Sequence, residues 1–209
     1  DRVVLCAGAI GSPLVLAASG LGGPAVGHGL QNHVGLPITL RLRTDAGAGW
    51  SGLVTGAHLR RGDLEVVALE RLGAASARLA MLLVVGMSPT GRGTVQAGPD
   101  GSAIVEHVLS DHDRARVEAA ATRARGLLGH PALGAIVDHA EIGAAPAGVF
   151  HPTSTCAIGR VVDADGRVPG VDGLFVADAS TFPSIPPAHT MIPTMLVADH
   201  LAGRLAAAG

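Results

Sequence analysis

The sequence has 209 residues, of which 48% are hydrophobic and 15% charged, which is typical of a folded globular chain and excludes a disordered one. The formal net charge is −2 and the basic residues are scattered, so the pattern excludes a nucleic-acid-binding surface. No apolar run reaches the roughly 18–20 residues of a membrane span, and no signal peptide is recognisable, so a cytoplasmic location is expected.

The first expected elements are a strand and a helix. Residues 3–7 form an apolar run typical of a buried strand. Ser12 is suited to cap a helix and Pro13 to occupy its first position, which predicts a helix over residues 13–19. Residues 20–25 fit the pattern G-x-G-x-x-A, but they follow a helix and contain Pro24. We therefore interpret them as a helix end and a loop, and not as a dinucleotide-binding turn.

The middle of the chain has the pattern of an antiparallel sheet. Strands are predicted at residues 38–43, 66–69 and 79–87. Residues 94–96 and 103–109 flank a Gly-Pro-Asp-Gly turn, which predicts a hairpin. Asp111 is suited to begin a helix that runs to about Leu128, where Gly129 would end it.

The last third returns to strand and helix patterns. Residues 161–162 and 167–168 flank Asp163-Ala164-Asp165-Gly166, which predicts a hairpin. Residues 174–177 predict a buried strand that ends at Asp178, and Ala179 and Ser180 follow it. The carboxyl end of such a strand is where α/β sheets bind ligands. A final helix is expected to start near residues 190–193 and to run to about Ala207. Its first backbone N–H groups, near Thr190, Met191 and Ile192, are suited to an anion.

Two loop histidines are the candidate catalytic residues. His151 precedes Pro152, which favours an extended conformation that projects the ring from the loop. His189 lies just before the final helix. The ten histidines include no HExxH motif, and no CxxC motif accompanies them, so no metal site is expected. No GxSxG motif is present either, which argues against a serine hydrolase.

Several of these segments together carry a family resemblance. Residues 8–22 resemble the second signature of the glucose–methanol–choline (GMC) oxidoreductases, and residues 26–33 are similar to the V-G-x-x-L-x-D-H that follows it. In this chain Asn32 stands where the family usually has Asp. Residues 92–95 look like the family's R-G-x-V, with Gly91 in the place of Ser. His151-Pro152, residues 171–174, residues 178–180 and the stretch from His189 to Thr194 are similar to its C-terminal block in order and spacing.

The resemblance implies an α/β fold with an α+β insert, in which the C-terminal part of a Rossmann-like FAD-binding domain is joined to an antiparallel-sheet substrate domain. Residues 1–35 and 150–209 would belong to the FAD-binding domain, and residues 36–149 to the substrate-binding domain. The Gly-rich FAD loop of the family has no counterpart in the sequence, so an N-terminal FAD-binding segment is expected to be missing. The isolated chain is then expected to be inactive.

The resemblance also implies the chemistry: FAD-dependent oxidation of a small-molecule alcohol to an aldehyde or ketone, with oxygen, a quinone or a protein as the electron acceptor. His151 matches the usual base, and His189 matches the partner that binds the substrate oxygen; many members carry Asn at the second position. Asp178, Ala179, Ser180, Thr190, Met191 and Ile192 would contact FAD. Two alternatives remain open, an inactive truncated copy and a non-redox member similar to the hydroxynitrile lyases.

Overall fold

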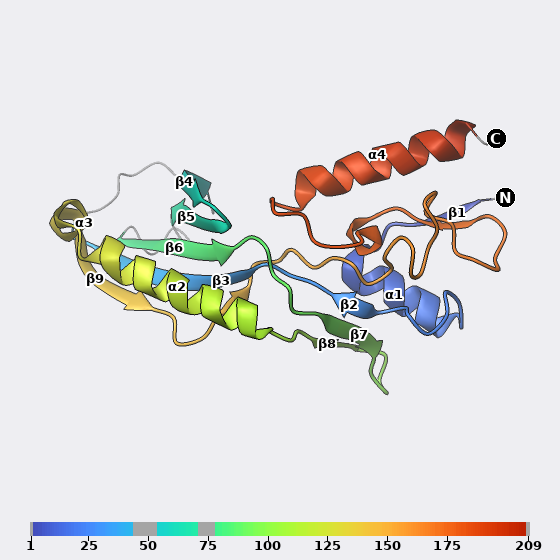
Figure 1. The fold of residues 1–209 in the computed structure, drawn as a ribbon, viewed down its shortest axis with the longest axis horizontal. Helices are drawn as coiled ribbons and strands as arrows, with labels where there is room; N and C mark the ends of the chain where they lie inside the picture. Colours follow the sequence, from blue (N-terminus) through green and yellow to red (C-terminus); the bar gives the residue numbers. More distant parts are fainter. Residues whose placement is uncertain (1, 44–53, 71–77, 208–209) are drawn as a thin grey trace. The chain divides into compact units, whose positions relative to one another are not determined.

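The computed structural model describes residues 2–43, 54–70 and 78–207, which fall into two compact units (Figure 1). Unit 1 is built from Asp1–His33, Ser88–Ser110 and Phe150–Gly209, and unit 2 from Val34–Met87 and Asp111–Val149. Residues 88–110 therefore belong to unit 1, whereas the sequence analysis placed them with the rest of residues 36–149 in the expected substrate-binding domain. The assignment of functions to the domains stays a prediction.

A short parallel sheet joins the two ends of unit 1. Strand β1 (Val3–Leu5) pairs in parallel with β11 (Leu174–Val176), and Val4 lies opposite Phe175. Both strands were predicted. Phe175 and Val176 are buried, but Val3 is 57% exposed, contrary to the burial expected for this run. The reason is that, among the described strands, β1 has only β11 as a neighbour.

Helix α1 (Gly8–Ala18) begins five residues before the expected start, and Ser12 does not cap it. The Ser12 hydroxyl instead donates to Oδ2 of Asp178 at 2.5 Å and accepts from the Ala7 N–H. Pro13 lies inside the helix, where it removes a hydrogen bond to the Ala9 carbonyl. The buried Thr155 hydroxyl donates to that carbonyl at 2.7 Å. A residue far away in the sequence thus makes Pro13 tolerable in the helix.

A three-stranded antiparallel sheet in the order β2-β7-β8 completes the strands of unit 1. Its members are β2 (His28–Leu30), β7 (Gly93–Ala97) and β8 (Ala103–Glu106), and the predicted hairpin between β7 and β8 is confirmed. Gly27 has a φ of +78°, and a Cβ atom there would lie 2.1 Å from the Val95 carbonyl oxygen. Only glycine allows this approach, through which the Val95 N–H donates to the Gly27 carbonyl at 2.8 Å.

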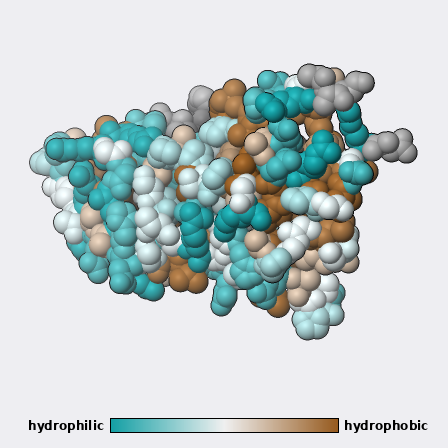
Figure 2. Space-filling view, turned by 45° about the vertical axis from the view of Figure 1, so that its right-hand side comes forward, coloured by the Kyte–Doolittle hydropathy of each residue, from teal (hydrophilic) through white to brown (hydrophobic). Residues whose placement is uncertain are grey.

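The final helix, α4 (Met191–Ala207), has the predicted bounds. Leu201 anchors it and is buried, whereas Ile192, Met195 and Leu196 are exposed. Figure 2 shows the hydrophobic residues on one face of the molecule in brown. Residues 163–166 form a turn in which the Asp163 carboxylate accepts the N–H groups of Asp165 and Arg167. The predicted hairpin is not formed, because Val162 and Arg167 make isolated bridges to other residues, Ile158 and Phe175. No helix in the described part of the chain is long and apolar enough to span a membrane.

Unit 2 is an antiparallel sheet covered by a helix (Figure 1). The strand order is β10-β3-β6-β5-β4, and β9 also pairs with β3. The strands are β3 (Val34–Leu42), β4 (Val54–Arg61), β5 (Leu64–Glu70), β6 (Leu79–Gly86), β9 (Val137–Ile142) and β10 (Ala147–Gly148). The sequence predicted β3, β5 and β6 but none of the other three.

Helix α2 (Asp111–Leu128) has the bounds expected from Asp111 and Gly129. Its Ala120 and Ala124 pack against Ile38, Leu40 and Val84 of the sheet, which makes the core of unit 2. A short helix, α3 (Pro131–Ile136), follows, and the His130 ring caps it by accepting the Ala132 N–H. This helix was not predicted.

Candidate active site

Three histidine rings meet in unit 1. The ring centroids of His151 and His189 are 5.1 Å apart, and the rings are nearly perpendicular. On its other side His151 meets His33 in the same way, also at 5.1 Å, and the Nδ1 atoms of His33 and His151 are 2.9 Å apart. The structure therefore brings together the two histidines singled out from the sequence and adds His33, which is fully buried.

The segment that carries His151 is held by the residues just before His33. The main-chain N–H of His151 donates to Oδ1 of Asn32 at 2.9 Å, and the backbones of Gln31 and Thr153 exchange N–H···O bonds at 2.9 and 3.1 Å. Ser154, which follows, is buried with a φ of +73°, a conformation that costs a non-glycine residue energy. Its N–H donates to the Ala179 carbonyl. Backbone strain is thus present three residues from the candidate base.

The side chain of Gln31 forms hydrogen bonds that hold the segment before His189 in place. Its buried side chain accepts the Ile185 N–H at Oε1 (3.0 Å) and donates from Nε2 to the Pro89 carbonyl (3.1 Å). His33 Nε2 lies 3.1 Å from the Pro186 carbonyl oxygen. The two loops that supply the histidines are therefore both fastened to the same short stretch, residues 31–33.

Asp178 lies at the carboxyl end of β11, and its carboxylate accepts hydrogen bonds from other residues of the chain. Its Oδ2 accepts the Gly8 N–H and the Ser12 hydroxyl, and its Oδ1 accepts the Ser180 N–H, which caps the short 3-10 helix η1 (Ala179–Thr181). The backbone carbonyl of Ser180 in turn accepts the Cys156 N–H. Direct contact of Asp178, Ala179 and Ser180 with FAD stays a prediction, since the Asp178 carboxylate already has three donors.

We expect Asp178→Ala to lower the free energy of unfolding by on the order of 3 kcal/mol, because it leaves two buried donors and one part-buried donor without this acceptor. Urea denaturation followed by circular dichroism measures the change. Asp165→Ala is the matched control, since Asp165 is an exposed partner of Arg204 and such pairs contribute about 0–1 kcal/mol. Equal losses for the two variants would contradict the structural role of Asp178.

The two cysteines differ in their surroundings. Cys156 is fully buried in the core of unit 1. The pKa of its thiol is raised to about 12, mainly by burial and also by the Asp178 charge, while hydrogen bonds with Ser180 and Thr155 oppose the increase. Cys6 is exposed. Its pKa is nevertheless raised by partial burial and by the Asp178 charge.

The first turn of α4 offers two backbone donors. Thr190 precedes the helix and its carbonyl accepts the Thr194 N–H, so the N–H groups of Met191 and Ile192 have no acceptor inside the helix. Pro193, next in the turn, has no N–H. Met191 and Ile192 are 68% and 57% exposed. This arrangement fits the electron-rich edge of a flavin ring.

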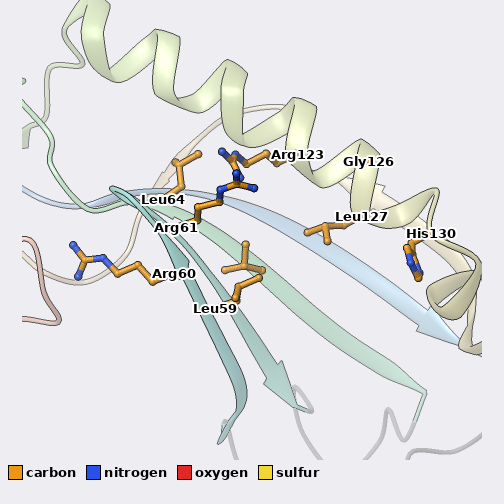
Figure 3. A pocket seen from close by; sticks show the side chains of 9 residues that line it. Leu59, Arg60, Arg61, Leu64, Arg123, Gly126, Leu127 and His130 are labelled. Carbon is orange, nitrogen blue, oxygen red and sulfur yellow. The ribbon is translucent and has the colours of Figure 1, made fainter.

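A cleft lies in unit 2, between α2 and the β4–β5 hairpin (Figure 3). The cleft has a volume of about 530 Å³ and apolar walls that include Leu59, Leu64 and Leu127. Arg61 and Arg123 point toward one another across it. Its one histidine, His130, uses Nδ1 to cap α3. The cleft therefore lacks the paired histidines of unit 1. Within the described ranges, no group of three or more His, Cys, Asp or Glu side chains is arranged to hold a metal ion.

The chain belongs to the GMC oxidoreductase family, whose model, described as "GMC oxidoreductase", matches residues 89–198, just over half of the sequence. FAD is the cofactor of this family. The fold agrees with this assignment. A crystal structure of pyridoxine 4-oxidase from Mesorbium loti superposes with a TM-score of 0.78 at 21% identity, over 98% of this chain and 51% of the other.

Two relatives extend the comparison. An uncharacterized GMC-type oxidoreductase of Mycobacterium tuberculosis is 29% identical over 274 aligned positions, which cover 96% of this chain and 52% of the relative. The 5-(hydroxymethyl)furfural oxidase of Methylovorus sp. is 49% identical over 61 residues, 26% of this chain and 12% of that enzyme. The chain thus spans about half the length of the relative that it matches throughout.

Proposed function

We propose that the chain is the substrate-side half of an FAD-dependent enzyme that oxidises an alcohol to an aldehyde or ketone. The observation that carries this proposal is the pair of perpendicular rings, His151 and His189, held 5.1 Å apart in a family of oxidoreductases. Two imidazoles at this separation can both reach one alcohol oxygen, since hydrogen bonds to it need about 2.6–3.2 Å. The arrangement supports proton removal from a hydroxyl group.

The two histidines have different roles in the proposal. An alcohol O–H does not ionise near neutral pH, so its proton must be taken by a positioned base as the hydride leaves the carbon. His151 takes this proton, and His189 donates a hydrogen bond that holds the alcohol oxygen. FAD, when bound, accepts the hydride. Because both rings face one oxygen, their protonation states are coupled and a single proton is shared by the pair.

The other residues of this half bind the cofactor. The N–H groups of Met191 and Ile192 at the start of α4 would hold the electron-rich edge of the flavin ring, and Thr190 sets the start of that helix. The turn at Ala179 and Ser180 contacts the ribityl and pyrophosphate part, with Asp178 holding the turn in place. In this proposal β1, α1 and β11 belong to a Rossmann-like FAD-binding domain. A further segment with a Gly-rich turn, as in the family, binds the adenosine and pyrophosphate.

The test is anaerobic flavin reduction. A protein that contains this chain together with an FAD-binding segment is expected to purify with flavin, and primary alcohols are expected to bleach the flavin absorbance. Adding oxygen, a quinone or a protein acceptor in separate arms then identifies which one restores the colour. Release of cyanide from a cyanohydrin without any bleaching would overturn the redox proposal in favour of a lyase. Flavin binding without either activity would favour an inactive copy.

A further inference from the structure

His33 occupies an unusual place for a histidine outside the proposed catalytic pair. Its ring is fully buried, and each of its nitrogens lies against one polar atom. Nε2 is 3.1 Å from the Pro186 carbonyl oxygen, and Nδ1 is 2.9 Å from Nδ1 of His151. The chemistry of these two neighbours decides where the hydrogen atoms must be.

The Pro186 carbonyl oxygen can only accept a hydrogen bond, so Nε2 of His33 must carry a hydrogen atom. A neutral imidazole carries only one, and its other nitrogen is then an acceptor. Nδ1 of neutral His33 therefore accepts from Nδ1 of His151. That contact gives His151 its ring hydrogen at Nδ1, which leaves the lone pair of the neutral His151 ring on Nε2.

We infer that His33 is a positioning residue that fixes His151 in the tautomer whose lone pair lies on Nε2. The inference rests on the proposed role of His151 as the base. It adds the atom that accepts the proton and the residue that selects it.

The opposite arrangement makes the consequence clear. If His33 carried both hydrogens, its Nδ1 would donate to Nδ1 of His151. The neutral His151 ring would then carry its hydrogen on Nε2, where it could not accept another. Once His151 has taken a proton in the inferred arrangement, its Nδ1–H still points at the His33 lone pair, which stabilises the new imidazolium. A carboxylate often has this orienting role beside a base; here a neutral ring fills it.

The backbone contacts keep this geometry in place. Asn32 accepts the His151 main-chain N–H, and Gln31 fixes the loop that contains Pro186 by accepting the Ile185 N–H. The acceptor at Pro186, the donor at His151 and the His33 ring between them are thus all tied to residues 31–33. This geometry leaves the His33 ring little freedom to turn over and exchange its two nitrogens.

The first test measures the tautomer directly in the FAD-containing protein. With histidine labelled by ¹⁵N, long-range ¹H–¹⁵N correlation spectra distinguish a nitrogen that carries hydrogen from one that does not, and His151→Asn assigns the signals of His151. We expect hydrogen on Nδ1 and a lone pair on Nε2 for His151, and hydrogen on Nε2 for His33. The reverse pattern on His151 would overturn the inference, whatever the enzyme turns out to catalyse.

The second test separates positioning from structural support. His33→Leu removes both polar contacts and is expected to slow alcohol-dependent flavin reduction by about 10–100-fold at unchanged flavin content. His33→Gln, whose side chain can accept from His151 and donate to Pro186, is expected to recover most of that loss. His200→Leu, on an exposed position of α4, is the matched control. Equal losses in the Leu and Gln variants, with His151 unchanged in its tautomer, would show that His33 only fills space.

Discussion

His189→Ala is expected to slow the alcohol-dependent reduction of the flavin by at least about 10²-fold, the lower end for a positioned acid–base group. His151→Ala is expected to have an effect of the same size or larger, because it removes the proton acceptor itself. The physical reason is the shared substrate oxygen, which loses either its base or its hydrogen-bond donor. Stopped-flow measurement of flavin bleaching under anaerobic conditions gives the rate of this half-reaction.

The controls decide whether such a loss of rate comes from the chemical step or from weaker flavin binding. Flavin content per protein must match the wild type, since His189 lies just before the helix that is proposed to contact FAD. His200→Ala, at an exposed position of the same helix, is expected to leave the rate unchanged. If His151→Ala and His189→Ala each lowered the rate of flavin reduction by less than threefold, the assignment of these residues as the catalytic pair would be contradicted.

The second large effect concerns stability at alkaline pH. Cys156 has a pKa of about 12 in the folded chain, against an ordinary value of 9.0. Burial favours the neutral thiol, so the stabilisation is fully present below pH 9 and is lost as the pH rises from 9 toward 12. In that range the unfolded chain releases the thiol proton and the folded chain keeps it. The free energy of unfolding should then fall by about 1.4 kcal/mol for each pH unit.

The composition makes this test unusually clean. The sequence contains no Lys and no Tyr, so the two cysteines are the side chains whose ordinary pKa values lie just below this range. Urea denaturation of the wild type and of Cys156→Ala between pH 8 and 11 is the measurement. We expect the advantage of the wild type to shrink as the pH rises, while Cys6→Ala shows a smaller pH dependence because Cys6 is exposed. Curves that stay parallel for wild type and Cys156→Ala would contradict a strongly raised pKa.

The sequence predicted an element well where its determinants are local. Helix α2 has the expected bounds because Asp111 begins it and Gly129 follows its last residue. Helix α1 was predicted to start five residues too late, because Pro13 is normally found in the first turn. The Thr155 hydroxyl that satisfies the Ala9 carbonyl is 146 residues away, and no local pattern reveals such a partner. Strand β9 was missed because its alternation is mostly polar and it is recognisable only beside β3.

The same limit applies to the site. The family resemblance pointed to His151 and His189, and the structure places their rings together. His33 lies within the same resemblance, but no role was predicted for it. The reason is that His151, the residue that it contacts, is 118 residues away in the sequence. The sequence feature that could have pointed to His33 is its position directly after Asn32, in a motif that precedes a strand. Only the fold shows which of the ten histidines lie next to one another.

The interleaved construction of the two units has a consequence for how the chain is made. Unit 2 is complete once Val149 has been synthesised, and its most distant strand pairing, between β3 and β10, spans fewer residues than the pairing of β1 with β11 in unit 1. Unit 1 cannot close until β11 pairs with β1, whose residues were made about 170 positions earlier. Such distant pairings form slowly, because a long loop must close before any contact forms. On the ribosome, we therefore expect the sheet domain to form first and the histidine cluster to assemble among the last features of the chain.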